Sequence, residues 1–130
     1  MKALVVSGTP EARAWMRGAL GPDWACDEAE DGLVALRIVR GDDVDLVIAD
    51  ESSEPLGAFG LAKELRTLPY PPAIVVILDR PQDAWLAAWS GADAWLLQPI
   101  DPFSLGRVAE EVIAGQDARA GEEPEPAAQE

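Results

Sequence analysis

Residues 45–50, Asp-Leu-Val-Ile-Ala-Asp, decide the fold. Four apolar residues in a row between two aspartates predict a short strand that is apolar on both faces, as in the middle of a parallel sheet. Two similar runs lie at Ala3–Val6 and Ile74–Leu78, and two shorter ones at Trp24–Cys26 and Trp95–Leu97. The sequence therefore predicts five strands, three of them covered on both faces.

Each predicted strand is followed by a segment whose apolar residues recur at helical spacing. Thr9 before Pro10, and Asp31 before Gly32, are typical helix N-caps. The predicted helices are Pro10–Leu20, Gly32–Arg40, Gly57–Leu68, Gln82–Ser90 and Pro102–Ala114. Strand–helix alternation, five times over, predicts an α/β fold: a doubly wound parallel sheet with helices on both faces.

The length of 130 residues suits one domain with one hydrophobic core. We assign residues 1–116 to that domain. From residue 117 the sequence is acidic and contains proline but no large apolar side chain, so we expect a disordered tail over residues 117–130.

The net charge of −14 excludes several classes of partner. Nucleic acids and anionic membranes are polyanions that bind through Lys and Arg, so we expect neither as a partner. No apolar run has the roughly 18 residues of a membrane span, and the N-terminus does not follow the pattern of a signal peptide. We therefore expect a cytoplasmic protein whose partners are other proteins.

The chain has no histidine, which excludes Ser-His-Asp and Cys-His catalysis and any metal site built from imidazole. The single cysteine, Cys26, lies in a predicted strand, and we expect a buried, unreactive thiol there. Neither feature favours an enzyme, so we expect a binding function.

Four motifs occur in order along the chain. They are Ala-Leu-Val-Val (3–6) with Pro-Glu-Ala-Arg (10–13), Glu-Ala-Glu-Asp-Gly (28–32), Asp-Leu-Val-Ile-Ala-Asp (45–50) and Gly-Ala-Asp-Ala-Trp-Leu-Leu-Gln-Pro (91–99). With these motifs the chain resembles, over residues 2–115, the receiver domain of two-component response regulators, the CheY-like family. The resemblance implies a flavodoxin-like sheet of order 2-1-3-4-5, with functional groups at the carboxyl ends of the strands. It also implies that Asp50 is equivalent to the family's phosphoacceptor.

The sequence departs from the family at the residues that carry its chemistry. The family holds Mg²⁺ with the acceptor and two adjacent acidic residues after the first strand, and these positions are Ser7 and Gly8 here. The family's lysine that pairs with the phosphoryl oxygens is Gln98, and Ala73–Trp89 contains no Ser or Thr to supply the hydroxyl at the end of the fourth strand. Because Mg²⁺ needs charged oxygen ligands, we expect no metal, no other cofactor and no phosphorylation of Asp50.

Three functions stay open from the sequence. The first is a pseudo-receiver that signals through protein contacts. The second is a single-domain response regulator that a histidine kinase still phosphorylates on Asp50; Glu51 and Glu54 are the residues that could rebuild a metal site. The third is a flavin or small-molecule site at the hydroxyl-containing loop 7–10, next to a helix N-terminus.

A predicted partner-binding surface consists of four large apolar side chains: Leu86, Trp89, Trp95 and Phe103. Three of them replace residues that the family usually keeps polar, and Trp95 holds an aromatic position that often faces partners in the family. Aromatic side chains on an acidic surface are typical of interface anchors, for a second copy or another protein. The alternative is a rotated helix 82–90 whose tryptophans fill the core, where we also expect Trp15, Trp24 and Trp85.

Overall fold

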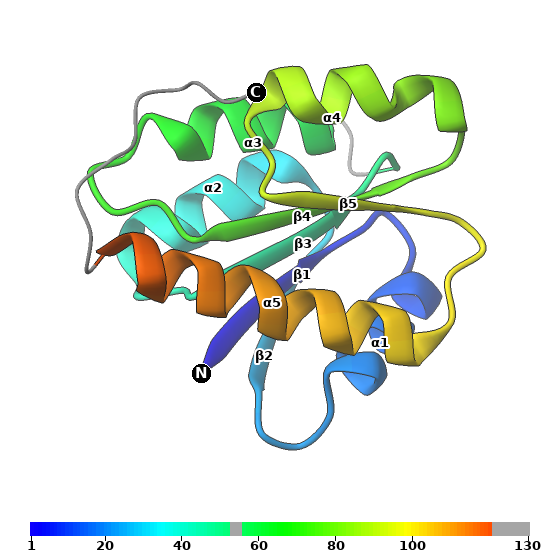
Figure 1. Cartoon of the computed structure of the whole chain (residues 1–130), viewed down its shortest axis with the longest axis horizontal. Helices are drawn as coiled ribbons and strands as arrows, with labels where there is room; N and C mark the ends of the chain where they lie inside the picture. Colours follow the sequence, from blue (N-terminus) through cyan, green and yellow to red (C-terminus); the bar gives the residue numbers. More distant parts are fainter. Residues whose placement is uncertain (53–55, 121–130) are drawn as a thin grey trace.

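The computed structural model of the chain describes residues 1–52 and 56–120, with the backbone alone at 116–120. The strands are β1 (Lys2–Val6), β2 (Ala25–Ala29), β3 (Leu46–Asp50), β4 (Ala73–Leu78) and β5 (Ala94–Leu97). They form a parallel sheet in the order β2-β1-β3-β4-β5 (Figure 1). The predicted fold class and strand order are confirmed.

Helices cover both faces of the sheet. They are α1 (Pro10–Leu20), α2 (Gly32–Gly41), α3 (Ala58–Arg66), α4 (Ala84–Ser90), preceded by a 3-10 turn at Pro81–Asp83, and α5 (Pro102–Ala120). In Figure 1, α1 and α5 lie on one face, and α2, α3 and α4 on the other. Thr9 caps α1 and Asp31 caps α2 through their side-chain oxygens, as predicted. Within residues 1–52 and 56–120, no helix is both long and apolar enough to span a bilayer.

The sheet separates two hydrophobic clusters because successive side chains of a strand point to opposite faces. Leu4, Val47 and Val76 pack with α2, α3 and α4, whereas Val5, Ile48 and Val75 pack with α1 and α5. Strands β3 and β4 are buried along their whole length, and β1 is buried from its second residue onward. The uninterrupted apolar runs were therefore correctly interpreted as strands covered on both faces.

Strand β5 lies at the edge of the sheet and alternates in burial. Ala94 and Leu96 pack in the α1–α5 cluster, so Trp95 and Leu97 lie on the α4 side, where both are partly exposed. Asp93 fixes the start of this strand: its carboxylate accepts a hydrogen bond from the Ile74 amide at 2.8 Å and pairs with Arg66 at 2.7 Å.

Three predictions need correction. Helix α5 ends at Ala120 instead of Ala114, so residues 117–120, which we assigned to a disordered tail, are helical. Alanine and arginine are good helix formers, and the next proline is Pro124; residues 121–130 of the predicted tail lie outside the described residues. Trp85, predicted in the core, is 66% exposed. Cys26 is half-buried instead of buried, although burial does raise the pKa of its thiol.

Gly32 allows the start of α2 to pack under the loop that follows β3. A Cβ atom at this position would overlap the carbonyl oxygen of Leu56. A backbone group cannot turn away as the end of a flexible side chain can. Any larger residue at position 32 therefore requires the loop to move.

We expect Gly32→Ala to lower the free energy of unfolding by about 1–3 kcal/mol, the usual cost of overpacking. Gly41→Ala, at the other end of α2, is the matched control because its Cβ would meet no atom within 4 Å. That control should be neutral or stabilising by up to about 1 kcal/mol. Urea unfolding followed by tryptophan fluorescence measures both, and equal stability of the two variants would contradict this packing.

Candidate functional site

The candidate site lies at the carboxyl ends of β1 and β3, which are neighbours in the sheet. Ser7 and Gly8 follow β1 directly, and Asp50 is the last residue of β3. The fold therefore brings these three predicted site residues together. Ser7 is 0% exposed and Asp50 is 5% exposed, so their polar atoms depend on partners within the protein.

Two serines donate hydrogen bonds to the Asp50 carboxylate. Ser7 Oγ donates to Oδ2 at 2.8 Å. Ser52 donates to Oδ1 twice, from its backbone amide at 3.0 Å and from its Oγ at 2.6 Å. These bonds replace the water that the carboxylate loses on burial.

The same serines also order the loop between β1 and α1. Ser52 Oγ accepts a hydrogen bond from the Gly8 amide at 3.1 Å, and Ser7 Oγ accepts one from the Thr9 amide at 3.3 Å. A Cβ atom on Gly8 would lie 2.8 Å from the Ser52 carbonyl oxygen. An acidic residue at position 8, as in the family that the sequence resembles, therefore does not fit this loop conformation.

Gln98 and Asp79 meet on the other side of the site. Gln98 follows β5, and its Nε2 donates to Asp79 Oδ1 at 3.3 Å. Asp79 is the first residue after β4, at the strand end where the resemblance implies a hydroxyl. The site thus carries a second carboxylate beyond Asp50, and the predicted residue Gln98 hydrogen-bonds to it.

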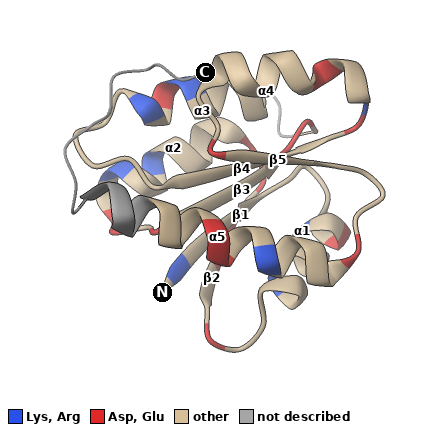
Figure 2. Cartoon of the chain, viewed as in Figure 1, with Lys and Arg blue, Asp and Glu red and all other residues tan. Residues whose placement is uncertain are grey.

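Further acidic side chains lie on the α4 side of the site. Glu51 Oε2 accepts a hydrogen bond from the Asp79 amide at 2.8 Å, and Asp83 pairs with Arg80 at 3.0 Å. Burial raises the pKa of Glu51, and the neighbouring Asp83 and Asp79 charges raise it too, against the lowering effect of the Asp79 amide. Figure 2 shows acidic residues in several loops at this end of the sheet.

The acidic residues of the described chain do not form a cluster of three that could hold a metal ion. Of the two predicted replacement ligands, Glu51 turns its carboxylate to the Asp79 amide, and Glu54 lies outside the described residues.

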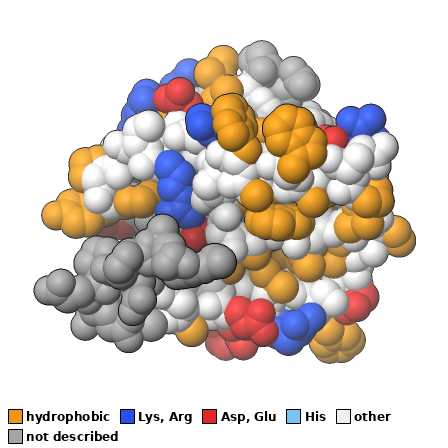
Figure 3. All heavy atoms as spheres, turned by 45° about the horizontal axis from the view of Figure 1, so that its top comes forward, with side chains coloured by type: hydrophobic (Ala, Val, Ile, Leu, Met, Phe, Trp, Pro, Cys, Tyr) orange, Lys and Arg blue, Asp and Glu red, His pale blue; other side chains and the backbone are white. Residues whose placement is uncertain are grey.

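The predicted partner-binding residues are all at least partly exposed. Trp89 is 58% exposed on α4, with Lys63 Nζ 3.9 Å from the centroid of its ring. Leu86 is half-buried, and Trp95 is 39% exposed on β5. Figure 3 shows hydrophobic side chains gathered over α4 and β5. Phe103 is almost fully exposed, but it lies in the first turn of α5, which covers the opposite face of the sheet.

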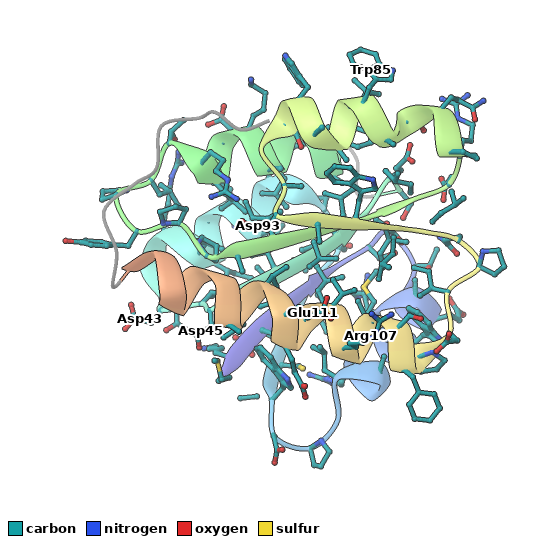
Figure 4. The ribbon with its side chains drawn as sticks, in the orientation of Figure 1. Asp43, Asp45, Trp85, Asp93, Arg107 and Glu111 are labelled. Atoms are coloured by element: carbon teal, nitrogen blue, oxygen red, sulfur yellow. The ribbon has the colours of Figure 1, made fainter. Side chains whose placement is uncertain are left out.

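Sequence reasoning missed several residues that the structure brings into these sites. Trp85 stands one turn before Trp89, and Figure 4 shows it projecting outward from α4; the spacing of four residues was its signal. Ser52 was detectable from Asp50-Glu51-Ser52, because an aspartate often accepts a hydrogen bond from the amide two residues later. Asp79 was detectable as the first polar residue after the apolar run of β4.

Comparison with curated proteins identifies relatives in two bacterial species. The chain is 36% identical over 115 residues to an uncharacterized response regulatory protein of Mycobacterium tuberculosis, a match that spans 82% of this chain and 86% of the relative. It is 32% identical over 120 residues to a gliding motility regulatory protein of Myxococcus xanthus, where the match spans 88% of this chain but 14% of the relative. No family model matches the chain.

Solved structures share the fold at lower sequence identity. A CheY-like receiver domain protein from Methanospirillum hungatei has a TM-score of 0.81 at 15% identity, over 90% of this chain and 96% of that one. A chemotaxis protein of Vibrio cholerae has a TM-score of 0.76 at 22% identity, over 85% and 97%. A response regulator from Thermotoga maritima, solved in complex with Mg²⁺ and BeF, has a TM-score of 0.76 at 23% identity, over 85% and 97%.

Ser7→Ala should lower the free energy of unfolding by about 1–3 kcal/mol, because the buried Asp50 carboxylate loses a hydroxyl donor. In an Asp50→Ala background the same change should cost less, since the carboxylate is gone and Ser7 Oγ keeps only its hydrogen bonds with the Thr9 amide and Ser52 Oγ. A double-mutant cycle from urea unfolding measures this coupling. Additive effects of the two substitutions would mean that the hydrogen bond does not stabilise the fold.

Proposed function

This chain belongs to the receiver family of two-component response regulators, and we propose that it is a pseudo-receiver of that family. In this role it signals through contacts with other proteins, without Mg²⁺-dependent phosphorylation of Asp50 and without catalytic activity. The observation that carries the proposal is the pair of serines, Ser7 and Ser52, that donate hydrogen bonds to both oxygens of Asp50.

The burial of Asp50 supports this proposal. A phosphoacceptor must present a carboxylate oxygen to the phosphoryl donor, in line with the leaving group. Asp50 is 5% exposed, and donors within 3.0 Å already bind both of its oxygens. Hydrogen-bond donors on both oxygens make the carboxylate less nucleophilic, which opposes attack on a phosphoryl donor and suits a structural carboxylate.

The charges around Asp50 support it as well. Phosphoryl transfer depends on cations that neutralise the oxygens of the transferred group. The family's lysine position holds the neutral Gln98, and the Asp79 carboxylate accepts a hydrogen bond from it. Removing one stabilising group from such a site typically costs about 2.7–4 kcal/mol in the transition state, and an added negative charge opposes transfer further.

The residues at the ends of β1 and β3 do not fit Mg²⁺. This ion prefers an octahedral set of oxygen ligands, usually with one or two carboxylates. Here the two strand ends supply the Ser7 hydroxyl and one carboxylate, which bond to each other, and Gly8 supplies no side chain. We therefore propose a module that needs no metal or other cofactor.

We propose that the protein partner binds the α4–β5 surface, which we define as Trp85, Leu86, Trp89, Trp95 and Leu97. Phe103, on α5, stays a predicted additional contact. Large exposed aromatic side chains on an otherwise acidic molecule are typical anchors of protein interfaces, because docking removes their apolar area from water. A second copy of the chain and a different signalling protein are both compatible with this surface.

Addition of Mg²⁺, with or without beryllofluoride, should leave the melting temperature and tryptophan fluorescence of the protein unchanged at millimolar concentrations. Ser7→Asp is the matched control, because it places a second carboxylate against Asp50 and supplies charge that Mg²⁺ requires. Mg²⁺ should raise the melting temperature of that variant. A saturable response of the unsubstituted protein that disappears in Asp50→Asn would overturn the proposed function.

Trp89→Ala should weaken association at least about tenfold, because truncation of an interface anchor commonly costs 2 kcal/mol or more. Its stability should fall by less than about 1 kcal/mol, since the side chain is exposed and loses mainly its contact with Lys63. Tyr70→Ala, at another exposed aromatic residue outside the surface, should leave association unchanged. Sedimentation measures self-association, and capture from a lysate measures binding of a different protein. Thermal melts measure the stability of each variant. A stability loss of about 3–5 kcal/mol would instead place Trp89 in the core.

A further inference from the structure

A pocket of about 250 Å³ opens beside Asp50, on the α1 side of the sheet. Trp15 and Met16 line it from α1, Ile77 lines it from β4, and Pro99 and Ile100 line it from the segment after β5. Its wall is therefore mostly apolar, with Asp50 as the acidic residue in its lining. Signalling through the α4–β5 surface gives this pocket no role.

Gln98 explains why the pocket carries a negative charge. The family that the chain belongs to has a lysine at this position, which would bring an ammonium group toward the aspartate. Gln98 is neutral, and its amide is bonded to Asp79 instead. Among the described residues that line the pocket, Asp50 is the one that carries a charge.

The lining selects against several classes of ligand. Phosphates and carboxylates are repelled by Asp50, and the net charge of −14 opposes their approach. The volume is below the range of about 300–1,000 Å³ that is usual for drug-sized ligands, so a flavin is too large. A neutral apolar molecule would fill the pocket but would gain nothing from the carboxylate.

An organic cation matches both features of the pocket. A carboxylate in a partly apolar environment attracts a positive charge more strongly than it does in water. Trp15 also lines the pocket, and tryptophan is the best aromatic partner for a cation that approaches the face of its ring. The apolar body of the ligand would contact Met16, Ile77 and Ile100.

We propose that this pocket binds a small organic cation: an amine with an apolar body about the size of one ring, its charged group directed toward Asp50. The inference rests on the proposed function in one respect, since it requires that Asp50 stays unphosphorylated. It adds an input that the proposed function does not name, namely a small molecule instead of a phosphoryl group.

Methyl NMR of the two methionines tests the proposal, with benzylamine as the probe and benzyl alcohol as its neutral counterpart. Met16 lines the pocket, whereas Met1 is exposed and lines a separate pocket with Trp24, Asp23 and Glu110, so the Met1 signal reports binding of the amine outside the proposed pocket. Benzylamine should shift the Met16 signal saturably and leave Met1 unchanged. Benzyl alcohol should bind at least about tenfold more weakly.

Three variants make the test specific. Asp50→Asn should weaken benzylamine binding at least about tenfold and leave benzyl alcohol binding unchanged. Ala12→Leu should fill the pocket and abolish the shift, while Ala14→Leu, exposed on the same helix, should preserve it. If Ala12→Leu fails to fold, the comparison of Asp50→Asn with the unsubstituted protein still tests whether benzylamine binding depends on the charge of Asp50.

Absence of a Met16 shift, equal binding of the amine and the alcohol, or an unchanged shift in folded Ala12→Leu would overturn the proposal. The titration is performed without Mg²⁺, so its outcome is separate from the response to Mg²⁺ and beryllofluoride. Benzylamine failing to bind, with no response to Mg²⁺, would overturn the pocket proposal alone. A response to Mg²⁺ would overturn the proposed function, whatever benzylamine does.

Discussion

The hydrogen bond from Ser7 to Asp50 is the constraint on which the rest of the site depends. Both residues are buried at the ends of neighbouring strands, so the carboxylate must find its donors inside the protein. Ser7 supplies one from β1, and Ser52 supplies two from the loop after β3. The conformation of the loop before α1 also depends on Ser52, because its Oγ accepts a hydrogen bond from the Gly8 amide. Ser7 and Gly8 thus stand where the family uses two acidic residues to hold a metal ion.

In the pseudo-receiver that we propose, no metal ion neutralises the acidic side chains around Asp50. Near a bound cation, acidic side chains would be neutralised; here Glu51, Asp79 and Asp83 are offset by backbone amides, Gln98 and Arg80. In this proposal the negative charge of Asp50 favours a small cation in the neighbouring pocket and disfavours a phosphoryl group.

The sequence predicted the fold well because its signals are local. Apolar runs such as residues 45–50, the caps Thr9 and Asp31, and the alternation of elements each depend on neighbouring residues. The family resemblance then placed Ser7, Gly8, Asp50 and Gln98 at one end of the sheet. It did not predict that Ser52 and Asp79 complete the site, since side-chain partners depend on loop conformation. Trp85 was misplaced because the rotation of a short, alanine-rich helix is not fixed by its sequence.

The most direct test of the account is whether Asp50 accepts a phosphoryl group. The protein should be incubated with Mg²⁺ and a small phosphoryl donor such as acetyl phosphate, and its intact mass recorded by mass spectrometry. The account predicts an unchanged mass. A mass increase of one phosphoryl group that is lost in Asp50→Asn would contradict it.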